Sequence, residues 1–377
     1  MRGVFINAEV LGPQGWEVRD LALDGTQIAS EVDAKRYDLS GFRLLPGIVD
    51  LHGDGFERHL APRRGAVQDL GAGLAATQAE LGANGITTAV LAQFFSWEGG
   101  MRSPDFAESM AAALSMFPSL LDLRLQLRLE THLTESYARA EALIERHNVG
   151  YLVLNDHLPH TALAKGRRPP RLTGQALKSG RSPEAHLALL TELAARDVSA
   201  EVAALVARLT LKGVLVGSHD DTSPQIRATY REMGAKLAEF PETIETAQAA
   251  KAAGDPVILG APNVLRGGSH AGKLRAADLV DADLCDALVS DYHYPAMIGA
   301  VQRLVADGVC DWAAAWQLVS ARPAEVLRLA DRGTLAPGNR ADIIAVEAAT
   351  GRTCLTLAAG QIAHLTDPLA GRLIAAK

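Results

Sequence analysis

The sequence predicts an α/β protein: a (β/α)8 TIM-like barrel with a small composite β-sandwich built from both termini. Short apolar runs alternate with helical stretches through the middle of the chain, and short alternating segments with Gly and Asp turns occupy both ends. His and carboxylate side chains follow the apolar runs, which is where a barrel of this class carries its active site. We expect the sandwich to comprise residues 1–45 and 331–377, and the barrel residues 46–330.

The elements are predicted from hydrophobic periodicity and turn residues. Terminal strands are expected at 3–10, 16–23, 27–30, 343–346, 352–358 and 361–365. Barrel strands are expected to end near Asp54, Gln93, His132, Asp156, His219, Gly260 and Asp291. Helices are expected at 70–84, 106–114, 136–147, 183–210, 244–253 and 298–308. Repeated strand–helix units imply a parallel sheet, and the absence of GxGxxG after the first strand weakens the alternative of a doubly wound open sheet.

Composition excludes several classes of partner. The net charge of −7 argues against binding to a nucleic-acid backbone. No run of about 18 apolar residues is present, so no membrane span is expected, and the N-terminus lacks the apolar core of a signal peptide. Cys285, Cys310 and Cys354 form no CxxC pair and are expected to be reduced thiols in a cytoplasmic protein.

The stretch from Leu44 to Asp54 carries the first chemical signal. An apolar run crosses a Pro-Gly turn and ends in His52 and Asp54, two residues apart. Residues at this spacing on a strand point to the same side, so both side chains can face one cation. The alternative is a core strand running into a turn that carries a His and an Asp by chance.

Four further strand ends supply similar side chains. Arg128, Glu130 and His132 alternate and would share one face of their strand, and His157, His219 and Asp291 each follow an apolar run. This donor set fits two divalent ions, zinc first, with manganese, iron or nickel as alternatives. Glu130 is the candidate bridging carboxylate, His157 and His219 are candidate ligands of one ion, and Asp291 could ligate the other and accept a proton from water. The sequence does not place His132, Asp220 or His293 relative to these ions.

A second pattern suggests anion binding. Residues 260–273 are rich in Gly and basic side chains, and Arg63 follows the first ligand strand. Backbone N–H groups near glycines and the two donors of an Arg can hold phosphate, although the GK[ST] signature of a P-loop is absent. The candidate substrate-binding residues are Arg63, Arg266, Gly267, Gly268, Ser269, His270 and Lys273. A flexible surface turn is the alternative. The basic stretch Lys165–Arg171 is expected to belong to a loop or lid within 158–182, or to a solvated surface loop.

These motifs resemble the amidohydrolase superfamily, through the Leu45–Asp54 motif, the strand-end ligands and the Gly333–Asp342 turn. More specifically, Asn155–His157, Ser218–Asp221, Glu239–Thr243, Gly260–Gly272 and Ser290–Pro295 resemble the α-D-ribose 1-methylphosphonate 5-triphosphate diphosphatase family. His-x-Asp, in place of the superfamily's usual His-x-His, fits this branch, whereas Gly53 and Gly55 depart from its pattern.

The resemblance implies a binuclear metal-dependent hydrolase of phosphonate catabolism. Metal-bound hydroxide would attack the α-phosphorus of the sugar triphosphate and release the 5-phosphate and pyrophosphate. His52 and Asp54 would bind one ion with Asp291 nearby, Glu130 would bridge, and His157 and His219 would bind the other, with Asp291 and His219 taking part in catalysis. The alternatives are a C–N hydrolase of the same superfamily (a deacetylase or deaminase) and a catalytically silent binding subunit. A homo-oligomer is compatible with the sequence.

Overall fold

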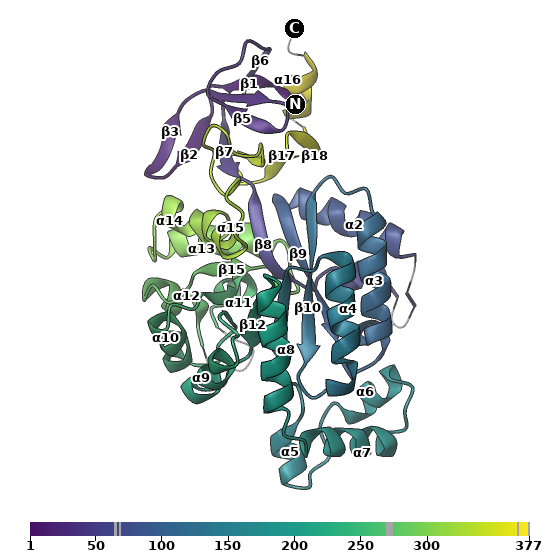
Figure 1. Ribbon diagram of the computed structural model, residues 1–377. Helices are drawn as coiled ribbons and strands as arrows, with labels where there is room; N and C mark the ends of the chain where they lie inside the picture. Colours follow the sequence, from purple (N-terminus) through teal and green to yellow (C-terminus); the bar gives the residue numbers. More distant parts are fainter. Residues whose placement is uncertain (64–65, 68, 269–273, 368, 376–377) are drawn as a thin grey trace. The chain divides into compact units, whose positions relative to one another are not determined.

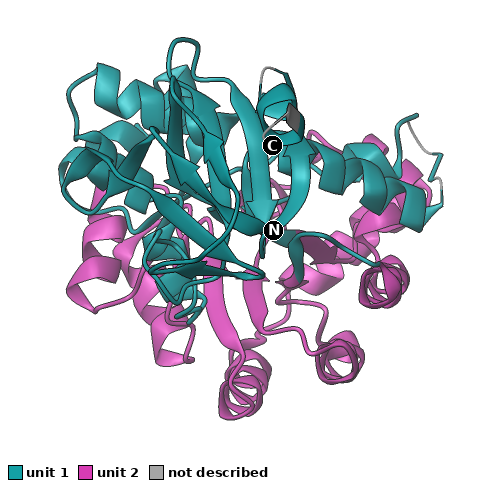
Figure 2. Cartoon of the chain, turned by 90° about the horizontal axis from the view of Figure 1, so that it is seen from above, with its two compact units in different colours: residues 1–91, 118–124, 258–377 teal, residues 92–117, 125–257 magenta. Residues whose placement is uncertain are grey.

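The computed structural model describes residues 1–377 except 64–65, 68, 269–273, 368 and 376–377. The predicted substrate-binding residues Ser269, His270 and Lys273 therefore lie outside the described part of the chain. The remainder forms two compact units, coloured separately in Figure 2: residues 1–91, 118–124 and 258–377 in the first, and residues 92–117 and 125–257 in the second.

Eight parallel strands form one sheet whose order follows the chain, as a (β/α)8 barrel requires. They are β8 (Ile48–Gly53), β9 (Ile86–Phe95), β10 (Asp122–Glu130), β11 (Tyr151–Asn155), β12 (Leu215–His219), β13 (Ala238–Glu239), β14 (Val257–Gly260) and β15 (Ala287–Val289). A parallel bridge between Gly53 and Asp291 links the first strand to the residues after the last. The barrel prediction is confirmed, with β13 as the strand that the sequence missed: two residues are too few to show a periodic pattern.

The terminal strands form two further sheets in the first unit, in the orders β5-β4-β1-β6 and β18-β17-β16-β7-β2-β3. Their bounds are Arg2–Ile6, Glu9–Gly12, Gly15–Val18, Leu21–Asp24, Gln27–Ala29, Arg36–Asp38 and Phe42–Pro46 for β1 to β7, and Ile343–Glu347, Thr353–Ala358 and Gln361–Leu365 for β16 to β18. Strand β16 pairs antiparallel with β7, so the two ends of the chain share one buried core that includes Phe5, Leu44 and Leu355.

The helices of the first unit are α1 (Glu57–Leu60), α2 (Leu70–Ala83), α11 (Ala261–Arg266), α12 (Ala276–Asp281), α13 (Ala296–Ala306), α14 (Trp312–Gln317), α15 (Ala321–Val326) and α16 (Leu369–Ala375). The predicted helices 70–84 and 298–308 correspond to α2 and α13. Helix α11 corrects the expectation of a Gly-rich loop from residue 260. Its six residues are helical, and glycines only flank it: Gly260 precedes its start, and Gly267, with φ 73°, follows its end.

The second unit contains α3 (Pro104–Met116), α4 (Tyr137–His147), α5 (His160–Ala164), α6 (Leu172–Lys178), α7 (Pro183–Ala194), α8 (Ser199–Leu211), α9 (Pro224–Glu232) and α10 (Ile244–Ala252), with 3-10 turns at Gly100–Arg102 and Thr134–Ser136 (Figure 1). Three of these helices begin with Ser-Pro, where the Ser side chain caps a backbone N–H and the Pro takes the first helical position. The predicted helix 183–210 is broken into α7 and α8, and the predicted loop 158–182 contains α5 and α6.

Among the described residues, no helix has the length and apolar character needed to span a membrane.

Candidate metal centre

The first unit holds three of the predicted ligands, His52, Asp54 and Asp291. His52 lies on β8 and is fully buried. The backbone N–H of Asp291 donates to the carbonyl of His52 (3.0 Å), and that of Asp54 donates to the carbonyl of Asp291 (2.8 Å). Asp291 adopts φ 54°, a left-handed conformation that is uncommon for a residue other than Gly. Main-chain hydrogen bonds therefore bring these three residues together where β8 and β15 end.

Close packing explains Gly53 in this motif. A Cβ on Gly53 would lie 2.8 Å from Ser290 Oγ and 2.9 Å from Asp50 Oδ2, so a side chain cannot be added without a shift. Asp50 is fully buried and accepts hydrogen bonds from the N–H (3.0 Å) and Oγ (2.5 Å) of Ser290. Burial raises the pKa of Asp50 despite these hydrogen bonds. Asp50 thus fixes the chain beside the three predicted ligands, a role that sequence reasoning did not assign.

The second unit holds the other three predicted ligands, Glu130, His157 and His219. Glu130, at the end of β10, is fully buried, and its Oε1 lies 2.5 Å from Nδ1 of His157. Its Oε2 accepts the backbone N–H of His157 at 3.2 Å. Burial alone would raise the pKa of Glu130, but the hydrogen bonds and charge of His157 outweigh it and lower that pKa. Burial would likewise lower the pKa of His157, and Glu130 reverses this. In the metal-free chain, this raised pKa favours a positively charged His157 beside the buried carboxylate of Glu130.

His219 is oriented by Glu239, a buried carboxylate that sequence reasoning missed as a site residue. Nδ1 of His219 lies 3.1 Å from Glu239 Oε2, and Nε2 lies 2.9 Å from Nη2 of Arg128. A guanidinium can only donate hydrogen bonds, so Nε2 of His219 is the acceptor. The ring proton is therefore on Nδ1, which donates a hydrogen bond to Glu239. Burial lowers the pKa of His219, which keeps the ring neutral. Nε2 thus presents its lone pair in the form that binds a metal ion.

Glu239 is itself held by two donors from strands β10 and β11, Gln126 Nε2 at 2.6 Å and the hydroxyl of Tyr151. In metal sites, a His ligand commonly binds the ion through one ring nitrogen and donates a hydrogen bond from the other to a carboxylate. Glu239 has the position of that carboxylate. The segment around Glu239 stood out in the sequence only through its resemblance to the diphosphatase family, because β13 is too short to mark it as a strand end.

Asn155 provides an independent indication of a ligand. It is fully buried at the end of β11, and neither its amide oxygen nor its amide nitrogen has a hydrogen-bond partner among the described residues. It shares the strand face of Tyr151, and it pairs in register with Glu130. Buried polar groups without a protein partner usually contact water, an ion or a ligand.

The donor set of the second unit therefore fits a divalent cation. Donor atoms of Glu98, Glu130 and His157 lie within 4.8 Å of one another, and so do those of His157, His219 and Asp220. Nitrogen and carboxylate donors of this kind suit zinc and its neighbours. Glu98 joins the set although the sequence did not predict it. Asp220, which the sequence left undecided, lies within reach of His219 (3.6 Å from Oδ2 to Nε2).

Other predicted residues lie apart from these donors. Strand β10 ends at Glu130, so the alternation does not extend to His132, which instead faces Asp156. The ring of His293 stacks on that of Tyr292, with centroids 6.3 Å apart.

Of the described substrate-binding candidates, Arg266 is exposed and its guanidinium hydrogen-bonds the hydroxyl of Tyr292 and lies 5.8 Å from the centre of its ring. Gly267 and Gly268 end helix α11, and the N–H of Gly268 donates to the carbonyl of Asn263. Arg63 is exposed and forms an isolated antiparallel bridge with Ala66.

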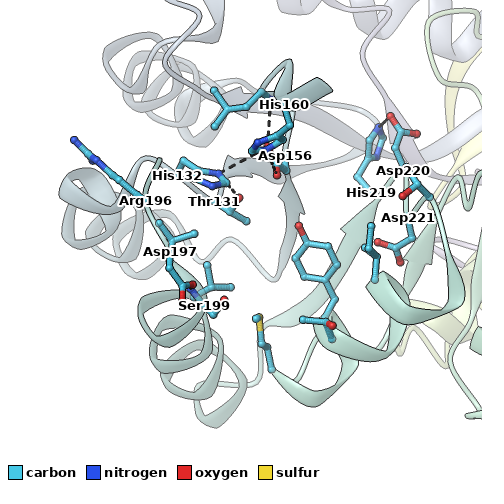
Figure 3. Close-up of a pocket in the computed structure, with 18 of the residues that line it drawn as sticks. Thr131, His132, Asp156, His160, Arg196, Asp197, Ser199, His219, Asp220 and Asp221 are labelled. Carbon is cyan, nitrogen blue, oxygen red and sulfur yellow. Dashed lines mark hydrogen bonds and ion pairs between the residues drawn. The ribbon is translucent and has the colours of Figure 1, made fainter. Parts of the chain in front are cut away.

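A cavity of about 820 Å³ opens within the second unit (Figure 3). His219 and Asp220 lie at one side of it, and His132, Asp156 and His160 lie together at another. Arg196, Ser199 and Tyr230 also line it. Its volume is within the range of small-molecule sites.

Comparison with known proteins gives one relative by sequence and many by fold. No protein-family model matches the chain. The chain is 30% identical over 343 residues to alpha-D-ribose 1-methylphosphonate 5-triphosphate diphosphatase of Escherichia coli (strain K12), covering 88% of this chain and 89% of that protein.

Solved structures share its fold at low identity. A β-aspartyl dipeptidase from Fervidobacterium islandicum AW-1 has a TM-score of 0.64 at 15% identity, covering 97% of each chain. An amidohydrolase has a TM-score of 0.67 at 14% identity, covering 97% of this chain and 100% of the other. An N-acetylglucosamine-6-phosphate deacetylase from Pasteurella multocida has a TM-score of 0.62 at 13% identity, covering 96% and 99%. At such identities the likeness concerns the fold alone.

Proposed function

Because this chain belongs to the α-D-ribose 1-methylphosphonate 5-triphosphate diphosphatase family of the amidohydrolase superfamily, we propose that it hydrolyses that sugar triphosphate to the 5-phosphate and pyrophosphate. The chain is a hydrolase by this membership. The observation that carries the finer proposal is the buried donor set around His219, whose metal-binding tautomer is fixed by Glu239. The cytoplasmic location and a homo-oligomeric assembly stay predictions.

We assign ligands for two divalent ions, and the ligands of each ion come from one compact unit. His52, Asp54 and Asp291 would hold one ion, and Glu130, His157 and His219 would hold the other, with zinc as the first candidate and manganese, iron or nickel as alternatives. Such ions, when bound, supply Lewis-acid chemistry: they neutralise phosphoryl charge and make an attacking water more acidic.

The chain's own residues perform the remaining steps. Asp291, held by its backbone bonds to His52 and Asp54, would accept the proton of the attacking water. His219 is kept neutral by burial and is held in one orientation by Glu239, so its part is to hold its ion in a fixed position. Phosphoryl transfer depends mainly on positioning and charge neutralisation, and exposed Arg266 and Arg63 are candidates to bind the outer phosphates, together with the backbone of Gly267 and Gly268. Ser269, His270 and Lys273 remain sequence-based candidates for the same task.

Phosphorus NMR tests the proposal. The purified, metal-loaded protein is incubated with the ribose methylphosphonate triphosphate, and separately with nucleoside triphosphates, in water enriched in ¹⁸O. Attack at the α-phosphorus breaks the bond to the bridging oxygen of pyrophosphate, so the label enters the sugar 5-phosphate and pyrophosphate stays unlabelled. No pyrophosphate from any triphosphate at full metal loading would overturn the proposal. Release of acetate from an N-acetylated sugar phosphate would instead support the C–N hydrolase alternative.

A further inference from the structure

A second group of side chains of the types that bind metal ions lies in the cavity of the second unit. His132 follows β10, Asp156 follows β11, and His160 begins α5. Oδ2 of Asp156 lies 2.8 Å from Nε2 of His160, and Oδ1 lies 3.7 Å from Nδ1 of His132. The two imidazole rings are 5.6 Å apart between centroids. Figure 3 shows the three side chains converging, with one carboxylate between two rings.

The donor atoms are spaced for a metal ion. One ligand atom from each of His132, Asp156 and His160 lies within 4.8 Å of the other two. Ligand atoms around a tetrahedral ion with bonds of about 2.0–2.1 Å lie roughly 3.4 Å apart, so small side-chain rotations suffice. Two nitrogens and one carboxylate oxygen form a ligand set of known metal enzymes. None of these residues belongs to the ligand set assigned to catalysis above.

The surroundings favour a cation. The described lining of the cavity includes the carboxylates of Asp156, Asp197 and Asp220 and one guanidinium, Arg196. A fourth carboxylate, Asp221, is paired with the buried guanidinium of Arg227. Thr131 Oγ1, 3.2 Å from His132 Nδ1, is a further oxygen at the same place.

We propose that His132, Asp156 and His160 form a binding site for a divalent transition-metal ion, separate from the catalytic centre. With three protein ligands, the ion keeps coordination positions that face the cavity. Its charge would offset carboxylates of the lining and let the cavity accept an anionic ligand. His132 and Asp156 flank the ends of β10 and β11, which fixes their main chain, and His160 is the more exposed member that completes the set.

Cobalt binding tests the site. The metal-free protein and its His160→Ala variant are equilibrated with Co²⁺ alone, and bound metal is counted by elemental analysis after gel filtration. His160 is partly exposed (45% of its side chain), so its removal should leave the fold intact, which circular dichroism checks. The matched control is His147→Ala, in the last turn of α4.

We expect His160→Ala to bind one equivalent fewer than the wild type and His147→Ala to bind the same number. Equal stoichiometry in His160→Ala and wild type at saturating Co²⁺ would overturn the proposal and leave the cluster as a hydrogen-bonded anchor of α5. The variant Glu130→Gln separates the two centres: it should keep the equivalent that His160→Ala loses, whether or not the catalytic proposal is correct. Loss of that same equivalent in Glu130→Gln would assign it to the catalytic set and would also overturn the separate site.

Discussion

Replacing Glu239 with Gln tests whether a buried carboxylate fixes the metal-binding form of His219. Glu239 is fully buried, and its two oxygens accept from Gln126, Tyr151 and His219. The amide of Gln has the same shape but one acceptor and one donor. If the amide oxygen keeps the hydrogen bonds from Gln126 and Tyr151, the NH₂ group faces Nδ1 of His219. Nδ1 must then lose its proton and accept a hydrogen bond from that NH₂ group. The proton moves to Nε2, the atom that the metal needs.

The expected cost follows from that exchange. Loss of an outer carboxylate partner of a metal-bound His weakens metal affinity or activity by about 10- to 100-fold. That range corresponds to about 1.4–2.7 kcal/mol at 25 °C. The metal-free protein should also lose stability, by about 1–3 kcal/mol, because charge-assisted hydrogen bonds become neutral ones in a buried place.

The assay compares Zn²⁺ affinity, the free energy of unfolding without metal, and pyrophosphate release for three proteins. The matched control is Glu245→Gln, the same exchange at an exposed position in the first turn of α10. We expect the control to behave like the wild type. Wild-type zinc affinity in Glu239→Gln, with stability reduced as predicted, would show that Glu239 serves folding only and would refute its orienting role.

Three further predictions concern single residues. Asp122→Asn should lower the free energy of unfolding at neutral pH by about 1–3 kcal/mol, because Arg332 Nη1, 2.7 Å away on a nearly buried side chain, loses its charged partner. Burial would raise the pKa of Asp122, but Arg124 and Arg332 lower it. The wild type's greater free energy of unfolding should therefore hold above pH 3.8 and fade as the pH falls below that value. A difference in stability that persists in acid would contradict this. Gly53→Ala should destabilise by about 1–3 kcal/mol through its contacts with Ser290 and Asp50, while Gly174→Ala, inside α6 with open space around it, should stabilise by about 0.5–1 kcal/mol, both measured by urea unfolding. Asn155→Leu should leave metal-free stability unchanged or higher and reduce kcat/KM about tenfold, because its amide has no described protein partner; a large loss of stability would show that it has one.

Strands and helices with several turns or alternations were predictable from the sequence, and the exceptions have physical causes. Strand β9 is ten buried residues, and α2 carries a capping Asp69 before its first turn, so both leave a local signal. Strand β13 has two residues and leaves none. Helix α11 was missed because glycines dominate its neighbourhood, although Pro262 near its start and Gly267 just past its end are themselves a helix signature.

The candidate site could be predicted from the sequence only where the type and position of a single residue indicate its chemistry. His and carboxylate side chains at strand ends could be named as donors, because their chemistry is visible one residue at a time. Glu239 could not, since its role depends on Gln126 and Tyr151, which lie 113 and 88 positions away. Asn155 is informative because its buried amide has no hydrogen-bond partner among the described residues. No sequence pattern shows whether an amide has such a partner.

The charges of the second unit explain how such a centre can fold before it binds metal. Glu130 and Glu239 are fully buried carboxylates, and each would cost several kcal/mol if unpaired. The imidazolium of His157 pairs with the first, and Gln126, Tyr151 and His219 hydrogen-bond the second. A divalent ion that binds here adds two positive charges, so charge balance favours loss of the proton on His157, and Nε2 of His219 must exchange the guanidinium of Arg128 for the ion. Arg128 would then be released toward a ligand with negative charge. On the proposed function, the ion would thereby convert the side chains that satisfy one another in the metal-free chain into a site for a phosphorylated substrate.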